Sequence, residues 1–251
     1  MKTIKDICYS EEHKQNLDLY LPDEDRFSVF VYFHGGGLES GDKATGAKFI
    51  QYLTSHGVCV VSANYRMYPD AKYPDFLVDS AEAVAWVFKN IGSYGKAEKI
   101  FVGGSSAGGY ISQMLCFDRR WLEPHGIKPA DIAGYVHDAG QPTSHFNVLR
   151  ERGLHKRRII IDETAPLYYV GVDEEYSPML IIVSDNDIGG RLEQTLLLNN
   201  TLDRFGHGDK YVYKLMSGKH CAYIKLLDEN GESIFGKMIC DFMFGEKYIT
   251  D

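Results

Sequence analysis

Runs of apolar residues alternate with amphipathic stretches along almost the whole chain. Short apolar runs predict buried strands, and apolar residues that recur at helical spacing predict helices. Strands are expected at residues 16–21 (an edge strand), 28–33, 58–63, 100–102, 132–140, 179–187 and 211–216, and helices at about 44–56, 76–91, 110–120, 191–205 and 235–245. This alternation predicts an α/β fold with a mostly parallel central sheet and helices on both faces.

One segment departs from this rhythm. Residues 141–177 contain the charged stretch RERGLHKRR and then the tyrosine-containing stretch PLYYV. Two interpretations stay open: a small cap inserted over the upper edge of the sheet, or an ordinary long connection with one core helix. The length of the chain favours a single domain spanning residues 1–251, with 141–177 as its cap insertion.

Composition narrows the class of protein. The 251 residues include 35 acidic and 27 basic ones, and the net charge of −8 argues against a nucleic-acid partner. No apolar run approaches the ~18–20 residues of a membrane span, and the first stretch, MKTIKDICYSEEHKQ, lacks the apolar core of a secretory signal. The five cysteines are scattered without C-x-x-C spacing, which favours free thiols in a reducing compartment. A cytoplasmic protein is expected.

The stretch FVGGSSAGGYISQM sets two serines among four glycines, between a predicted strand and a predicted helix. A nucleophile at the tip of such a turn has a strained backbone, so the residues two positions before and after it must be small. For Ser106 both of these neighbours are glycines, which completes the pattern G-x-S-x-G, whereas for Ser105 one of them is Ala107. We therefore expect Ser106 to be a nucleophile, with Ser105 packed beside it. The lysine of a phosphate-binding Walker loop is absent here.

The stretch HGGGL follows the predicted strand at 28–33. Glycines at such a position let backbone N–H groups point into a cavity, where they can receive the oxyanion that forms when a serine attacks an acyl group. We expect the N–H groups of Gly36, Gly37 and Ala107 to form this oxyanion hole. Together with the serine turn, HGGGL predicts acyl transfer.

A serine hydroxyl needs a general base, and topology selects one histidine of the nine. In a parallel sheet the reactive edge lies at the carboxyl ends of the strands. His220 directly follows the strand 211–216, whereas His207 precedes it and falls at the opposite edge. We expect His220 to be the base.

The same rule narrows the choice of the acid that orients this base. Asp185 and Asp187 both follow the apolar run MLIIV. Counting from Ser184, which stands in the place of the glycine of a G-x-x-D pattern, selects Asp187. Asp185 remains the alternative candidate for the acid, and its other possible role is to cap the turn after the strand.

Five stretches, in this order, resemble a known family: HGGGL, NYRMYPDAKYPDFLVDSAEAVAWV, GGSSAGGY, SDND and SGKH. The chain resembles, from about residue 16 onward, the α/β-hydrolase carboxylesterases of the hormone-sensitive-lipase-like group, which include small bacterial acyl-carbohydrate and feruloyl esterases. The resemblance implies an α/β-hydrolase fold and a catalytic triad of Ser106, Asp187 and His220. It also implies that the segment beginning NYRMYP braces the oxyanion loop, and that Asp79 matches an aspartate common in the family.

The expected function is therefore a serine carboxylesterase that hydrolyses short-chain or small aromatic acyl esters of soluble alcohols, acylated carbohydrates among them, through an acyl-enzyme. Leu38 stands where the family often has an aromatic residue, so we expect it on the acyl side of the pocket. Aromatic rings beside hydrogen-bonding side chains suit a sugar or phenolic group, and the expected contacts are Gln141, His145, Tyr168 and Tyr169. The basic cluster at 150–158 either forms a solvated face or meets an acidic group of the substrate.

Two other classes remain as alternatives. A serine peptidase of this fold often has a separate domain that restricts access, for which this chain leaves no room. A non-catalytic ligand-binding homologue would usually have lost its serine or histidine. No cofactor, no metal ion, no nucleic acid and no membrane is expected as a partner. The expected partner is a small ester, and either a monomer or a homodimer remains open.

Overall fold

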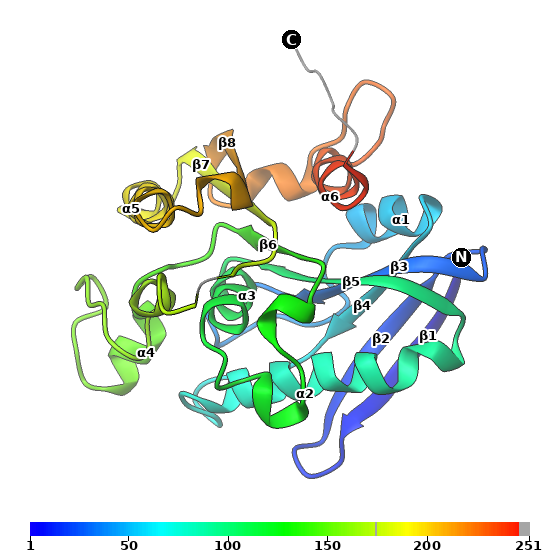
Figure 1. The fold of residues 1–251 in the computed structure, drawn as a ribbon, viewed down its shortest axis with the longest axis horizontal. Coiled ribbons are helices and arrows are strands. Elements are labelled where there is room, and N and C mark those ends of the chain that lie inside the picture. Colours follow the sequence, from blue (N-terminus) through cyan, green and yellow to red (C-terminus); the bar gives the residue numbers. More distant parts are fainter. Residues whose placement is uncertain (174, 246–251) are drawn as a thin grey trace.

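The computed structural model describes residues 1–173 and 175–245 (Figure 1). Within them, eight strands form one sheet in the order β1-β2-β4-β3-β5-β6-β7-β8. Their bounds are β1 Lys2–Ser10, β2 Gln15–Leu21, β3 Arg26–Phe33, β4 Val58–Ala63, β5 Lys96–Ser105, β6 Gly134–Asp138, β7 Met179–Asn186 and β8 Tyr211–Lys219. β2 pairs with both β1 and β4 in antiparallel fashion, and the neighbours from β4 to β8 are parallel. The predicted α/β fold with a mostly parallel sheet is confirmed.

Helices cover both faces of this sheet (Figure 1). Their bounds are α1 Ala47–Ser55, α2 Asp75–Asn90, α3 Ala107–Phe117, α4 Phe146–Glu151, α5 Arg191–Arg204 and α6 Ile234–Phe244. Side chains of α1 and α6 share one apolar cluster with strand residues, and side chains of α2, α3 and α5 belong to a second cluster. The sheet therefore has a separate apolar core on each face.

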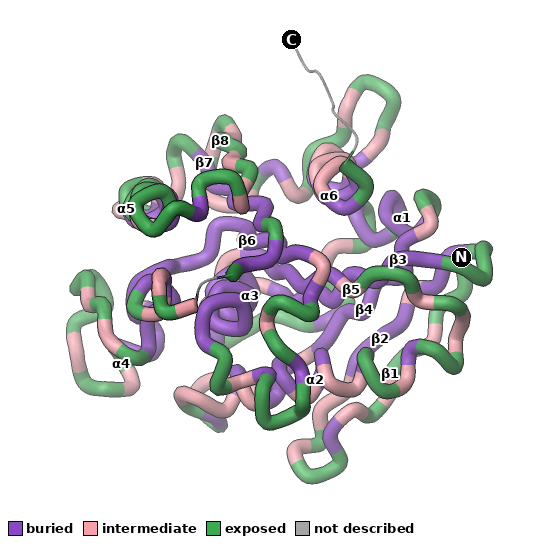
Figure 2. The backbone as a smooth tube through the Cα atoms, viewed as in Figure 1, coloured by how far each residue is buried: buried purple, intermediate pink, exposed green. Residues whose placement is uncertain are grey.

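The helix α3 lies at the centre of the molecule. All of its residues are buried, and the tube of Figure 2 is purple along its whole length. It contacts β5, β6 and β3, and α2 packs beside it. Because α3 begins immediately after Ser106, the most enclosed helix positions that serine.

The segment 141–177 connects β6 to β7. It contains α4 and the short 3₁₀ helix η4, Pro166–Tyr169, and its other described residues are irregular. The Asn147 side-chain amide donates a 2.8 Å hydrogen bond to the carbonyl of Gly37. The start of α4 therefore lies against the glycine-rich stretch that follows β3.

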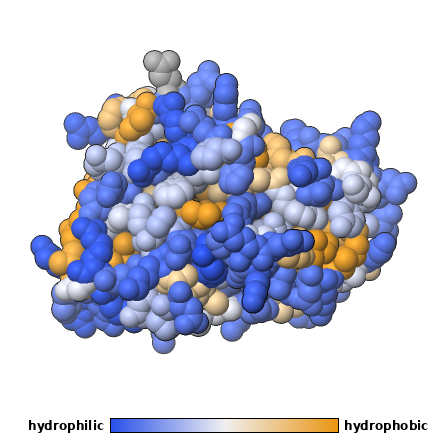
Figure 3. All heavy atoms as spheres, turned by 90° about the horizontal axis from the view of Figure 1, so that it is seen from below, coloured by the Kyte–Doolittle hydropathy of each residue, from blue (hydrophilic) through white to orange (hydrophobic). Residues whose placement is uncertain are grey.

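The surface is mixed in character. On the face shown in Figure 3, hydrophobic residues lie in small, separate groups among hydrophilic ones. Among the helices of the described residues, none has both the length and the apolar character that crossing a bilayer requires.

Candidate active site

The turn from β5 into α3 holds Ser106 in an unusual backbone conformation. Its φ is 57° and its ψ is −108°, a strained combination for a residue with a side chain. The turn is also crowded, because a Cβ added at Gly108 would lie 1.9 Å from the carbonyl oxygen of Phe33, and one at Gly104 would lie 2.5 Å from Gly108. Glycines two residues before and after Ser106 thus allow the turn to approach β3.

The two adjacent serines have different surroundings. Ser105 is the last residue of β5, is buried, and accepts a 3.1 Å hydrogen bond from the hydroxyl of Tyr32. The Ser106 hydroxyl is instead 2.7 Å from Nε2 of His220, which follows β8. The arrangement gives Ser106 a basic partner and gives Ser105 a packing position.

The second imidazole nitrogen of His220 faces a carboxylate. Its Nδ1 lies 2.6 Å from Oδ1 of Asp187, which follows β7. Burial opposes ionisation of Asp187, but hydrogen bonds from His220 and from the Ile188 N–H outweigh it, so the pKa of Asp187 lies below its ordinary value. An ionised Asp187 accepts a hydrogen bond from the Nδ1–H of His220, which keeps the proton on Nδ1 and leaves the Nε2 lone pair directed at Ser106.

Asp185 lies outside this chain of hydrogen bonds. Its Oδ1 accepts a 2.8 Å hydrogen bond from the N–H of Gly218, and its side chain is exposed. That contact joins the end of β7 to the end of β8. Asp185 therefore stabilises the strand ends, while Asp187 faces the imidazole.

Backbone N–H groups border the same site. Ala107 is the first residue of α3, so its N–H has no partner within the helix, and the helix dipole favours negative charge there. Gly36 and Gly37 have φ of 122° and 68°, and a Cβ at Gly36 would lie 1.8 Å from the carbonyl oxygen of Ser40. In the described part of the chain, the N–H groups of these three residues donate no hydrogen bond within the protein. They are available to an incoming oxygen.

A second segment holds the glycine-rich loop in place. The Tyr65 hydroxyl donates a 2.7 Å hydrogen bond to the carbonyl of His34, and the Tyr68 N–H donates a 2.8 Å bond to the carbonyl of Leu38. Between these tyrosines, the guanidinium of Arg66 makes an ion pair with fully buried Asp79 of α2, at 2.7 Å. The segment therefore links the loop to α2.

A buried polar group beneath Ser106 was not predicted from the sequence. Asp138 ends β6, its carbonyl accepts a 2.8 Å hydrogen bond from the Ser106 N–H, and its carboxyl accepts one from the hydroxyl of Tyr223. Burial raises the pKa of Asp138 to about 6, against the lowering effect of the Ser105 and Tyr223 hydroxyls. The rule that selected Asp187, a polar residue at the carboxyl end of a strand, also finds Asp138.

The predicted substrate contacts have varied positions. A cavity of about 560 Å³ is lined in part by Ile188 and Gly189, which follow Asp187 in the chain, and of the predicted contacts only Gln141 lines it. Leu38 is completely buried in the core, and His145 is enclosed between the rings of Tyr110 and Phe146. These two side chains contribute to packing and do not line the cavity.

The two tyrosines lie elsewhere, on η4. Tyr168 is 55% exposed and lines a separate hollow together with Tyr73 and Arg152. Tyr169 donates a 2.9 Å hydrogen bond to the carbonyl of Glu163. The structure therefore does not bring Tyr168 and Tyr169 to the cavity that Gln141 lines.

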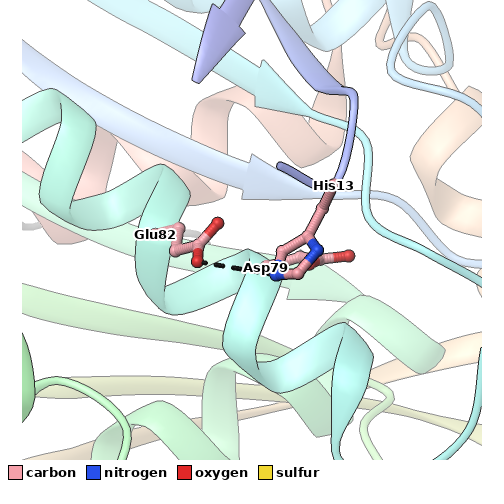
Figure 4. Close-up of side chains that lie close together, drawn as sticks. All are labelled: His13, Asp79 and Glu82. Carbon is pink, nitrogen blue, oxygen red and sulfur yellow. Dashed lines mark ion pairs between the residues drawn. The ribbon is translucent and has the colours of Figure 1, made fainter. Parts of the chain in front are cut away.

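Three potential metal ligands meet away from this site. Atoms of His13, Asp79 and Glu82 lie within 4.8 Å of one another, where the turn between β1 and β2 meets α2 (Figure 4). The Asp79 carboxylate is already held by two nitrogens of Arg66, and Nε2 of His13 lies 3.9 Å from Glu82. Because the guanidinium would repel a metal cation, the arrangement suits an ion-pair cluster that joins the hairpin to α2.

The family of the chain follows from sequence comparison. A family model described as alpha/beta hydrolase fold matches residues 30–226, most of the chain, so this chain belongs to that α/β-hydrolase family. A curated relative is the probable carboxylesterase 13 of Arabidopsis thaliana, 30% identical over 155 residues. The match covers 53% of this chain and 47% of that protein. The chain thus spans less than half the length of this relative.

Solved structures show the same fold. Esterase B from Lactobacillus rhamnosis has a TM-score of 0.77 and 18% identity, with coverage of 96% of this chain and 84% of that one. The propionate-bound form of the thermophilic esterase Est2 from Thermogutta terrifontis has a TM-score of 0.73 and 20% identity, with coverage of 97% and 94%. At sequence identities this low, the similarity to these structures shows a shared fold and nothing more.

Proposed function

We propose that this protein is a serine carboxylesterase for small esters with short or small aromatic acyl groups. The observation that carries the proposal is the continuous series of contacts from Ser106 through His220 to Asp187, at 2.7 and 2.6 Å. It lies at the carboxyl edge of the parallel sheet. The esterase names of the curated and structural relatives support the same activity.

The proposed reaction has two steps. The Ser106 oxygen attacks the ester carbonyl while Nε2 of His220 takes its proton, and the oxyanion accepts hydrogen bonds from the N–H groups of Gly36, Gly37 and Ala107. His220 then gives the proton to the departing alcohol, which leaves an acyl-Ser106. Water, activated by the same imidazole, hydrolyses this acyl-enzyme and releases the acid. No cofactor is needed for either step.

Three observations support small substrates. The cavity volume of about 560 Å³ suits a small molecule. A Cβ at Gly37 would lie 3.1 Å from the ring of Phe146, so this ring narrows the space beside the oxyanion loop. Est2 was solved with propionate, a short acid. Short acyl chains on a soluble alcohol or sugar are the proposed substrates.

The test uses p-nitrophenyl acetate, butyrate and decanoate beside an aminoacyl p-nitroanilide. We expect hydrolysis of the two short esters, and a loss on the order of 10³-fold or more for Ser106→Ala. The matched control is Ser105→Ala, which removes the neighbouring hydroxyl and is expected to keep most of the activity. Preference for the decanoate, for the anilide, or no hydrolysis at all would overturn the proposal. Full activity in Ser106→Ala would show that another residue is the nucleophile.

A further inference from the structure

The cavity that Gln141 lines has a basic wall. Its lining includes Lys156, Arg157, Arg158 and Arg191, and among the described residues that line it none is acidic. The protein as a whole carries a net charge of −8. A concave region with this local excess of positive charge is therefore unlike the average surface, and it attracts anions.

Some residues that line the cavity are neighbours of the proposed catalytic residues. Ile188 and Gly189, which line it, directly follow Asp187. Phe146, also in the lining, packs near Gly37, since a Cβ added at that glycine would lie 3.1 Å from its ring. The cavity is therefore bordered by the residues that follow Asp187 and by a ring that packs near the glycine-rich loop.

Arg191 forms the buried part of the wall. Its side chain is 3% exposed and donates hydrogen bonds to the carbonyl of Ala139 and to Oε1 of Gln141, both neutral acceptors. Among the described residues no carboxylate makes an ion pair with it, and the acidic residue that acts on it, Asp187, already pairs with His220. Burial lowers the pKa of Arg191. A buried cation whose hydrogen-bond acceptors are neutral is stabilised by an anionic ligand.

The exposed cations of the wall have no ion-pair partner among the described residues either. In the same segment, Arg150 pairs with Glu39 and Arg152 pairs with Asp162. Within the part of the chain that the structure describes, the three cations at 156–158 make no such pair. Their charges remain available to a molecule in the cavity. Arginine in particular binds planar carboxylates with two parallel hydrogen bonds.

We infer that the cavity binds an anionic group, a carboxylate, of the ester substrate. This inference rests on the proposed esterase function and names its substrate class: esters that carry a carboxylate on the alcohol or on the acyl side. Arg191 forms the floor of the anion site, and the cations at 156–158 form its rim. The remainder of the substrate extends from there toward Ser106.

The test compares esters that differ in one charge. For the alcohol side the pair is 4-acetoxybenzoate and 4-acetoxybenzamide, and for the acyl side it is the mono-p-nitrophenyl ester of terephthalate and the corresponding terephthalamate. We expect a higher kcat/KM for the anionic member of at least one pair, mainly through a lower KM. Raising the salt from about 0.02 M to about 0.5 M is expected to reduce this preference.

The variant Lys156→Gln/Arg157→Gln/Arg158→Gln removes the rim. We expect it to lower the anionic-to-neutral ratio of kcat/KM at least about tenfold, with a much smaller effect on the neutral ester. The matched control, Lys2→Gln/Lys48→Gln/Lys225→Gln, changes the net charge equally at exposed positions outside this cavity. We expect the control to keep the wild-type ratio.

The outcomes separate the two proposals. Hydrolysis of neutral esters with no preference for the anion, or an equal loss of ratio in both triple variants, would overturn the anion site and leave the esterase proposal intact. No hydrolysis of any ester would overturn the esterase proposal. In that case calorimetry of benzoate and benzamide binding still tests the cavity. Equal affinity for the two ligands would overturn the anion site.

Discussion

Charged groups differ in burial and in pairing between the site beneath Ser106 and the wall of the cavity. Beneath Ser106, Asp138 is completely buried, and its carboxyl accepts a hydrogen bond from the Tyr223 hydroxyl. In the cavity wall, the cations at 156–158 are exposed and have no ion pair among the described residues. A buried group with fixed partners orders its neighbours, whereas an exposed and unpaired charge costs little and remains available for binding. The first region is built for position and the second for recognition.

The largest effect is expected where position controls the chemistry. Asp187→Asn keeps the shape of the side chain but removes the charge that orients His220, so kcat is expected to fall on the order of 10³–10⁴-fold. Hydrolysis of p-nitrophenyl acetate measures this loss. Asp185→Asn is the matched control and is expected to stay within about tenfold of wild type. The reverse result would make Asp185 the acid.

Variants at the ion pair between Arg66 and Asp79, in the segment that holds the glycine-rich loop, test whether buried charge also determines the stability of the fold. Asp79→Asn leaves the guanidinium of Arg66 without its buried partner, and the free energy of unfolding is expected to fall by about 3 kcal/mol. Denaturant unfolding measures the change. Asp75→Asn removes the more distant and exposed partner of Arg66, at 3.9 Å, and is expected to cost less than about 1 kcal/mol. Equal costs would contradict this assignment.

The buried carboxyl of Asp138 is expected to make the free energy of unfolding depend on pH. Its pKa is about 6 in the folded protein and 3.8 ordinarily, so the folded state binds the proton more tightly than the unfolded chain. Stability from this group is therefore present below about pH 4 and is lost as the pH rises to about 6. An asparagine at this position does not titrate, so the variant Asp138→Asn has no such pH-dependent loss. Between pH 4 and pH 7 the free energy of unfolding of this variant, relative to that of the wild type, is expected to rise by about 2–3 kcal/mol. Urea unfolding at both pH values measures this, and parallel pH curves would contradict it.

The exposed cations are expected to have the smallest effect on stability. The variant Lys156→Gln/Arg157→Gln/Arg158→Gln loses charge but no ion pair within the described chain, so its free energy of unfolding is expected to change by less than about 1 kcal/mol. The same urea titration checks this expectation. A loss of several kcal/mol would show that these residues support the fold, and the contrast between the two regions would disappear.

Elements with strong local signals were predictable from the sequence. The strand β4 has the predicted bounds, Val58–Ala63, because a short apolar run is buried on both faces of a parallel sheet. The strand β1 was missed because it lies at the edge of the sheet, where most of its side chains are exposed and polar. The expectation that 16–21 forms the edge was therefore wrong, since β2 lies between β1 and β4. An edge strand has little apolar periodicity to detect.

The same difference governs the site. Ser106 and His220 lie within local patterns, a glycine-flanked turn and a strand end. The carboxyl of Asp138 instead accepts a hydrogen bond from Tyr223, which is far away in the sequence. No local sequence pattern predicts that contact. The cavity wall likewise combines 156–158 with Arg191, and only the folded chain brings them together. The position of Ser106 at the turn could be predicted from the sequence, but the composition of the cavity wall could not.

The complete burial of α3 has a consequence for amide hydrogen exchange. Apart from the N–H of Ala107 at its start, which is free among the described residues, this enclosed helix exposes its hydrogen-bonded N–H groups only when the sheet and its neighbouring helices separate. These amides are therefore expected to exchange through global unfolding. The N–H of Tyr110, which donates to the Ser106 carbonyl at 3.0 Å, belongs to this slowest class. Local fraying therefore cannot relax the strained turn, and Ser106 keeps its geometry for as long as the molecule stays folded.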